Sequence, residues 1–381
     1  MSTPPDMAPL AKHFPALDGL RGIAILLVLV HMFNLLGAQD GVAAYLSSRV
    51  SYFGWTGVQL FFALSGFLIT GLLLDTQRAG NYFSGFYARR ALRIFPLYFA
   101  VLALAFIVLP AVGIMPAKIA ADQPNQVWLW TYLTNLAGHF DMASKGFPHF
   151  WSLAVEEQFY LVWPFLMYAR SPTQCVRLCV AAAVASLALR IVLASMGTLD
   201  DMIYHDSFCR MDALALGAAA AAAMRVPAYR QWLIARHRKL LVAAAILLVA
   251  GALVTQGFRL YTFAGETVGY TFISLEFVLL LIAAVCAESE DARGWVRVLR
   301  WGPLRAVGKY SYAMYLFHKP LHDYVGRPLV TALGFDVAGS VMRNAAYMLV
   351  ATLVTFALAV LSWHLFEKHF LKLKIYFAAR P

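Results

Sequence analysis

Long apolar runs, each close to 20 residues, recur along the chain and are separated by short segments that hold most of the polar residues. A run of about 20 apolar residues is what an α-helix needs to cross the hydrocarbon core of a bilayer. Ten such runs can be placed, at about 17–36, 57–74, 95–112, 153–169, 177–196, 208–224, 240–257, 268–287, 308–326 and 344–366. The pattern predicts an all-α, polytopic membrane protein with about ten transmembrane helices.

The composition favours the same class. Hydrophobic residues make up 61% of the chain and charged residues only 13%, whereas soluble domains lie near one half and one quarter. The longest segment between runs covers about residues 113–152, which leaves no room for a soluble catalytic module. We therefore expect one integral membrane domain over residues 1–381, with no soluble accessory domain. The first run lacks a clear cleavage site, so we interpret it as a retained span.

Lys and Arg are unequally divided between the segments that connect the runs. If the N-terminus is inside, the inner segments hold 21 of these cations and the outer segments hold six. The positive-inside rule then predicts that both termini are in the cytoplasm, as in a multi-pass protein of the plasma (inner) membrane. The net charge of +11 reflects this topology, so we expect membrane lipids rather than nucleic acid as partners.

Two ionisable residues occur within the first run, Arg21 near its start and His31 near its end. Ionisable residues are costly in a membrane span and are kept mainly where they line a cavity or bind a ligand. On one helix they lie about 15 Å apart along the axis, about half the hydrocarbon thickness. Alternatively, Arg21 extends to the headgroups and His31 is a packed, hydrogen-bonded residue between helices.

An arginine cluster, Arg89, Arg90 and Arg93, precedes the third run at the predicted cytoplasmic boundary. Arg89 and Arg93 are spaced i,i+4 and share one helix face. Such clusters often serve only as positive-inside anchors. With Arg21 at the same level, however, four guanidinium groups can converge, and their forked donors match phosphate oxygens. We therefore predict a polyphosphorylated cytosolic ligand here.

Two adjacent carboxylates, Glu156 and Glu157, lie in the first turns of the fourth run. One interpretation is that they are acidic residues that stabilise the start of a helix and have no catalytic role. Yet Glu156 is expected at the depth of His31, and a carboxylate bonded to an imidazole stabilises its protonated form, as a general base needs. Three further polar residues are expected in the same outer half, Arg210, Asp212 and His318, for which structural roles are equally reasonable. The lone charges Arg190 and Glu276 are interpreted as structural.

Six segments together resemble the membrane acyltransferase type 3 family, in the same order and across nearly the whole chain. They are LDGLRGIAILLVLVH, FFALSGFLITGLLL, YARRALRIFPLYF, FWSLAVEEQFYLVWP, CRMDALALGA and YSYAMYLFHKP. The resemblance implies transfer of an acyl group, most often acetyl, from cytosolic acyl-CoA to a hydroxyl of a glycan, a lipid-linked sugar or another envelope acceptor. Many members have two adjacent histidines where this chain has His31 and Met32, so a second histidine role is in doubt.

By position, the resemblance implies that His31 is catalytic, and it identifies Glu156 as the carboxylate of the WSL-x-x-E motif. We assign acyl-CoA binding, with acetyl-CoA the usual donor, to Arg21, Arg89, Arg90 and Arg93. We assign acceptor binding to Trp151, Ser152, Glu157, Arg210, Asp212 and His318. The four cysteines have no zinc spacing, and we expect no metal.

Two other functional classes stay open at this point. A transporter or flippase would use the intramembrane His, Arg and Glu residues as a proton or anion path, although no repeat or pair of broken helices is apparent. A binding-only membrane scaffold would leave the polar residues unexplained. For the acyltransferase, His31 can activate the acceptor hydroxyl directly or first accept the acyl group, because both routes need the same imidazole.

Overall fold

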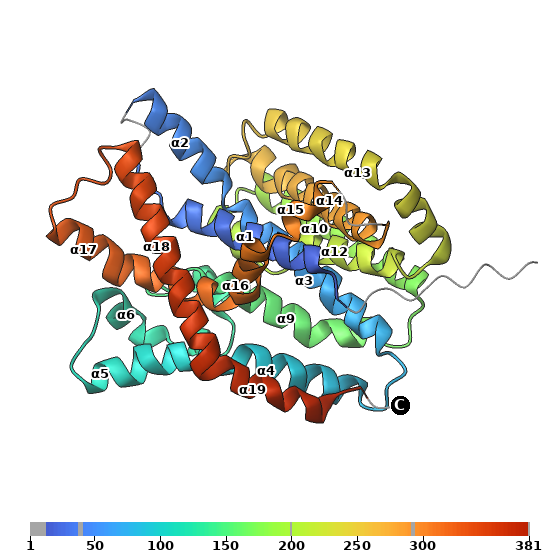
Figure 1. Ribbon diagram of the computed structural model, residues 1–381, viewed down its shortest axis with the longest axis horizontal. Coiled ribbons are helices and arrows are strands. Elements are labelled where there is room, and N and C mark those ends of the chain that lie inside the picture. The colour runs from blue at the N-terminus through green and yellow to red at the C-terminus, as the bar shows by residue number, and fades with distance from the viewer. Residues whose placement is uncertain (1–12, 37–40, 199, 291–293, 380–381) are drawn as a thin grey trace, which may run out of the picture.

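The computed structural model describes residues 13–36, 41–198, 200–290 and 294–379, and every regular element among them is helical (Figure 1). The all-α prediction is therefore confirmed. Lys12, Arg293 and Arg380, three of the cations counted above, lie outside the described residues. The α-helices are α1 (Pro15–Phe33), α2 (Val42–Phe53), α3 (Thr56–Asp75), α4 (Tyr82–Ala103), α5 (Leu109–Ala111), α6 (Ala117–Asp122), α7 (Val127–Trp130), α8 (Thr134–Ala137), α9 (Phe150–Met167), α10 (Pro172–Ser195), α11 (Asp200–His205), α12 (Met211–Ala223), α13 (Pro227–Val254), α14 (Tyr270–Glu290), α15 (Val296–Leu299), α16 (Gly302–Leu321), α17 (Arg327–Ala332), α18 (Val341–Ser362) and α19 (Lys368–Lys372).

Seven helical segments within the described residues are long and apolar enough to cross a membrane. They are Pro15–Phe33, Val42–Asp75, Tyr82–Ala111, Pro172–Ser195, Pro227–Val254, Gly265–Glu288 and Val341–Phe377. The other three predicted runs coincide with α9, α12 and α16, which are shorter or more polar: α12 has 13 residues and α9 carries both glutamates. The structure thus supports a multi-pass membrane protein with seven candidate spans.

Close helix crossings hold the centre of the molecule together. Figure 1 shows α1 crossing the middle of the bundle, and α1 packs against α3 and α16. A Cβ added to Gly66 of α3 would lie 1.9 Å from the Leu214 carbonyl oxygen on α12, and one added to Gly308 of α16 would lie 1.8 Å from the Asp18 carbonyl oxygen on α1. Small residues permit this approach between helices in a membrane. The crossings fix α1 and α3 around the polar residues described next.

The end of the bundle at which α1 begins gathers several chain segments. The Arg225 guanidinium at the end of α12 donates to the Asp75 carboxylate at the end of α3, with an N–O distance of 2.6 Å. The Arg89 Nη1 atom donates to the Phe377 carbonyl oxygen at 2.9 Å, which ties the start of α4 to the end of the last helical segment. The start of α1 lies at the same end of the bundle as the last helical segment (Figure 1).

Candidate active site

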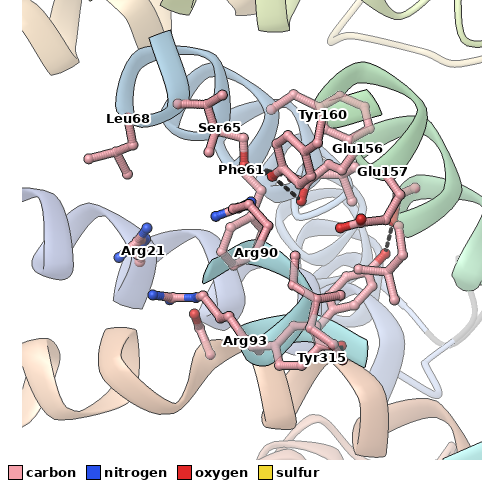
Figure 2. A pocket seen from close by; sticks show the side chains of 18 residues that line it. Arg21, Phe61, Ser65, Leu68, Arg90, Arg93, Glu156, Glu157, Tyr160 and Tyr315 are labelled. Atoms are coloured by element: carbon pink, nitrogen blue, oxygen red, sulfur yellow. Dashed lines mark hydrogen bonds between the residues drawn. The ribbon is translucent and has the colours of Figure 1, made fainter. Parts of the chain in front are cut away.

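A cavity of about 100 Å³ lies among α1, α3, α4, α9 and α16, and we call it the arginine cavity (Figure 2). It receives Arg21 from α1, Arg90 and Arg93 from α4, and Glu156 and Glu157 from α9. Figure 2 shows the three arginine side chains reaching toward the same space, with the two glutamates across it. Its hydroxyl-bearing lining residues are Ser65, Ser152, Tyr160, Ser311, Tyr312 and Tyr315. With Ser152 of α9, the structure thus brings together six of the predicted site residues from three helices.

The three guanidinium groups of this cavity are poorly neutralised. Among the described residues, Arg90 and Arg93 form no ion pair, and Arg21 has only Asp18, with an N–O distance of 3.7 Å. The Arg90 guanidinium carbon lies 3.9 Å from the centroid of the Tyr160 ring, which is a cation–π contact. This contact does not use the N–H donors at the edge of the guanidinium group. Three guanidinium groups with unused donors form a site for an oxyanion.

The fourth predicted arginine, Arg89, is not part of the arginine cavity. Its guanidinium bonds to the Phe377 carbonyl oxygen on the other side of α4. The i,i+4 spacing predicts that Arg89 and Arg93 share one helix face. In the structure, Arg90 and Arg93, at a spacing of i,i+3, are the two that line the cavity. Both spacings bring side chains together on a helix, so the pattern alone does not choose between them. The docking of the C-terminal segment on α4 decides which face meets the cavity.

Hydroxyl groups hold the Glu156 carboxylate in place. Ser65 Oγ donates to one carboxylate oxygen at 2.9 Å, and Tyr160 OH donates to the other at 2.8 Å. Tyr160 OH also lies 3.0 Å from Ser65 Oγ. Because these hydroxyls satisfy Glu156, the carboxylate does not pair with an arginine of the same cavity. Glu157 lines the cavity beside it.

His31 lines a second cavity of about 320 Å³, which we call the histidine cavity. It is formed by the end of α1 and by α2, and its lining residues are His31, Asn34, Leu36, Ser48, Arg49, Ser51 and Tyr52. The expected bond between His31 and Glu156 is not formed. Among the described residues, the His31 ring bonds only to the Ser51 carbonyl oxygen, and Glu156 bonds to Ser65 and Tyr160. Ten residues of α1 separate Arg21 from His31, about 15 Å along the axis.

The contact with Ser51 fixes the tautomer of His31. His31 Nδ1 lies 3.2 Å from the Ser51 carbonyl oxygen. A carbonyl oxygen can only accept a hydrogen bond, so Nδ1 carries the proton in a neutral imidazole and Nε2 keeps its lone pair. A backbone carbonyl thus orients the ring as a carboxylate does in other histidine bases. The imidazole is arranged to take a proton at Nε2.

Arg210 and Asp212 do not pair with each other. Asp212 forms an ion pair with Arg190 at 2.8 Å, and both side chains are fully buried. Arg210 donates to the Gln59 side-chain oxygen at 2.7 Å, and its guanidinium carbon lies 4.2 Å from the Tyr270 ring centroid. Arg190 is therefore not the lone charge that the sequence indicated. Neither Arg210 nor Asp212 lines either of the two cavities.

The remaining predicted acceptor residues lie at or behind the wall of the arginine cavity. Ser152 lines it, and its Oγ atom lies 2.6 Å from Tyr315 OH. Trp151 packs against Phe62 and Tyr204 behind the wall. His318 bonds through Nδ1 to the Tyr315 carbonyl oxygen at 2.6 Å.

Ser65, Tyr160 and Tyr315 were not predicted as site residues, although each lies in one of the six segments quoted above. A hydroxyl inside an apolar run is the signal that points to them. Arg49, counted only as an outer cation, lines the histidine cavity. Among the described residues, no group of three or more His, Cys, Asp or Glu side chains is arranged to hold a metal ion.

The helices and the two cavities define a multi-pass membrane protein with an arginine-lined cavity. A family model described as an acyltransferase domain matches residues 14–364. The chain therefore belongs to this acyltransferase family, as the six segments predict, and its class is that of an acyltransferase enzyme.

Several proteins of known name are similar to the chain. The O-acetyltransferase OatA of Staphylococcus aureus (strain NCTC 8325 / PS 47) is 28% identical over 82% of this chain and 51% of its own length. The peptidoglycan O-acetyltransferase OatA of Listeria monocytogenes is 27% identical over 90% and 54%. The putative peptidoglycan O-acetyltransferase YrhL of Bacillus subtilis (strain 168) is 28% identical over 94% and 55%. The chain thus spans about half the length of these relatives. No solved structure matches it.

Proposed function

We propose that the chain is a membrane O-acetyltransferase that moves an acetyl group from cytosolic acetyl-CoA to a hydroxyl of an envelope glycan. The observation that carries this proposal is the convergence of Arg21, Arg90 and Arg93 in one cavity. Among the described residues, Arg90 and Arg93 have no partner carboxylate, and Arg21 has only Asp18. A membrane protein that only needed anchoring would leave such cations at the surface. Family membership and the names of the relatives support acetyl as the group transferred.

In this proposal the arginine cavity binds the phosphates of the donor. Guanidinium groups bind phosphate oxygens through two parallel N–H bonds, so three of them can hold a polyphosphate firmly. The long pantetheine arm of CoA then extends along α1 toward His31. Glu156, fixed by Ser65 and Tyr160, limits the positive charge of the empty cavity without neutralising any single arginine.

His31 is the proposed catalytic base. Its Nε2 takes the proton of the acceptor hydroxyl while that oxygen attacks the thioester carbonyl carbon. The carbon–sulfur bond then breaks, an ester forms, and the thiolate leaves as CoA thiol after taking the proton from the imidazole. A route through an acyl-histidine has the same overall balance, because the acyl group passes from sulfur to nitrogen and then to oxygen.

We further propose ten membrane crossings, with both termini in the cytoplasm of a plasma (inner) membrane protein. The seven long segments would be joined by α9, α12 and α16, which are sheltered by neighbouring helices and so tolerate polar residues. The bond between Arg89 and Phe377 supports an even number, because it joins the start of α4 to the C-terminal segment at the end where α1 begins.

The acceptor is proposed from the names of two similar proteins. They are named a peptidoglycan O-acetyltransferase and a putative peptidoglycan O-acetyltransferase, which supports a peptidoglycan glycan or its lipid-linked precursor as acceptor. Of the predicted acceptor residues, Ser152 and Glu157 line the arginine cavity, which this proposal assigns to the donor. Trp151 and His318 lie behind its wall, and Arg210 and Asp212 are held in structural contacts, so we do not retain these four as direct acceptor ligands.

An oriented vesicle assay tests this proposal. The purified chain is reconstituted so that the end bearing Arg89 faces acetyl-CoA and the other end faces a soluble glycan acceptor. We expect release of free CoA on the donor side and acetylated glycan on the acceptor side, with little release when acetyl-CoA is supplied only on the acceptor side. Movement of the acceptor across the membrane without CoA release would instead support the transporter alternative.

A further inference from the structure

Arg49 of α2 is an outer-side cation that lines the histidine cavity. Two other cations from the outer segments are paired: Lys118 contacts Asp323 at 2.6 Å, and Arg343 contacts Asp336 at 3.4 Å. Arg49 forms no ion pair with any carboxylate in the described parts of the chain. Its positive charge therefore stands beside the predicted catalytic imidazole without a described counter-charge.

The backbone of a neighbouring loop holds the Arg49 guanidinium in position. Nη2 donates to the Gln256 carbonyl oxygen at 3.2 Å, which is the one hydrogen bond of this side chain among the described residues. The adjoining Gly257 has φ +87°, and a Cβ there would lie 2.5 Å from Arg49 Nη2, so the loop leaves room for the guanidinium. One of five N–H donors is used for positioning, and the others bond to no group in the described parts of the chain.

The remaining lining groups indicate what that ligand is. Asn34 and Ser48 add an amide and a hydroxyl, which are suited to sugar hydroxyls. Each is also bonded within the protein: Ser48 Oγ donates to the Tyr45 carbonyl oxygen at 2.8 Å, and the Asn34 amide oxygen accepts from Asn344 at 2.9 Å. Their second lone pairs remain as acceptors for a sugar hydroxyl. A guanidinium fork fits either a carboxylate or a phosphate, and with Arg49 as the one Lys or Arg that lines this cavity, the single charge of a carboxylate is the better match. The cavity therefore combines the His31 imidazole as a base, neutral hydrogen-bonding groups, and the Arg49 guanidinium, which can bind a carboxylate.

We propose that the histidine cavity is the acceptor site and that Arg49 binds a carboxylate of the acceptor sugar, next to the hydroxyl that His31 deprotonates. This inference rests on the proposed function. Arg49 thereby selects acidic glycans over neutral ones, and the donor phosphates remain with Arg21, Arg90 and Arg93.

Acceptor selectivity tests the inference. The full chain in vesicles receives acetyl-CoA and one of three probes: an N-acetylhexosamine disaccharide with one carboxylate, the same disaccharide with that group converted to an amide, and a disaccharide 1-phosphate. We expect kcat/KM for the carboxylate to exceed that for the amide about ten- to a hundredfold, as a charge-assisted hydrogen bond gives. Arg49→Gln abolishes this preference and leaves the KM for acetyl-CoA unchanged, whereas Arg49→Lys keeps part of the preference.

Arg327→Gln is the matched control, because Arg327 is another outer arginine outside the histidine cavity. It should keep the full carboxylate preference. Equal use of carboxylate and amide by the unmodified chain, or an unchanged preference in Arg49→Gln, would overturn the inference and leave the proposed function standing. A preference for the 1-phosphate would overturn the carboxylate assignment. Absence of CoA release with all three acceptors would overturn the proposed function as well.

Discussion

The two cavities on α1 differ in depth and in the way that their polar groups are held. The arginine cavity is enclosed by five helices, and its groups are positioned by side chains such as Ser65 and Tyr160. The histidine cavity is formed by the end of α1 and by α2, a helix at the edge of the view in Figure 1, and its groups are positioned by backbone carbonyls of Ser51 and Gln256. A charged donor needs an enclosed site with fixed cations, whereas a bulky glycan needs an accessible one. The contrast suggests that the two substrates enter from different places.

The largest effect is expected at His31. Replacement by Ala removes the base and should lower acetyl transfer about 10²- to 10⁴-fold, the usual contribution of a general base. Binding of CoA should be unchanged, since the arginine cavity is separate. Initial rates and CoA affinity measured on the same preparation check both statements. His139→Ala is the control, because His139 is exposed and outside both cavities. Near-normal turnover by His31→Ala would contradict the assignment of the catalytic base to the histidine cavity.

A smaller loss is expected from the arginines, and it should fall on the donor. Arg90→Lys and Arg93→Lys keep the charge but lose the forked geometry, so the Kd for CoA should rise about tenfold in each. Arg89→Lys is the matched control: it is adjacent on α4, carries the same substitution and contacts the Phe377 carbonyl oxygen instead of the cavity. Titration calorimetry with CoA measures all three. Equal losses in the three variants would indicate a general effect of charge at this end of the molecule.

The smallest effect is expected at the hydroxyls that hold Glu156. Ser65→Ala and Tyr160→Phe each remove one donor to the carboxylate, which frees it to approach Arg90 and compete with the phosphates. The net contribution of a typical hydrogen bond is about 0.5–1.5 kcal/mol, so the KM for acetyl-CoA should rise about twofold to tenfold. The double variant with Glu156→Gln should recover much of this loss. A change confined to the KM of the acceptor would contradict the assignment of this cavity to the donor.

The sequence was most informative where one property is repeated along a segment. Apolar runs of near-membrane length predicted an all-helical multi-pass protein, because only a helix satisfies its own backbone polar groups in lipid. The run boundaries follow the helices closely, for example 344–366 against α18 and the segment that continues it. The charges Arg21, Arg90 and Arg93 were also informative, because the cost of burying them implies a shared polar site. Glu156 was expected at the depth of His31 instead, and the structure places it with these arginines.

Only the tertiary structure decided how these charges are partnered. Arg89 and Arg90 are adjacent and chemically identical, and the docking of the C-terminal segment determines which of them meets the cavity. Arg190 was assigned no partner, yet it pairs with Asp212, because helix packing brings α10 against α12. His31 and Glu156 were matched by depth alone, whereas the rotation of each helix directs them to different cavities. Depth follows from position along the chain, but rotation and pairing depend on side-chain packing between helices distant in sequence.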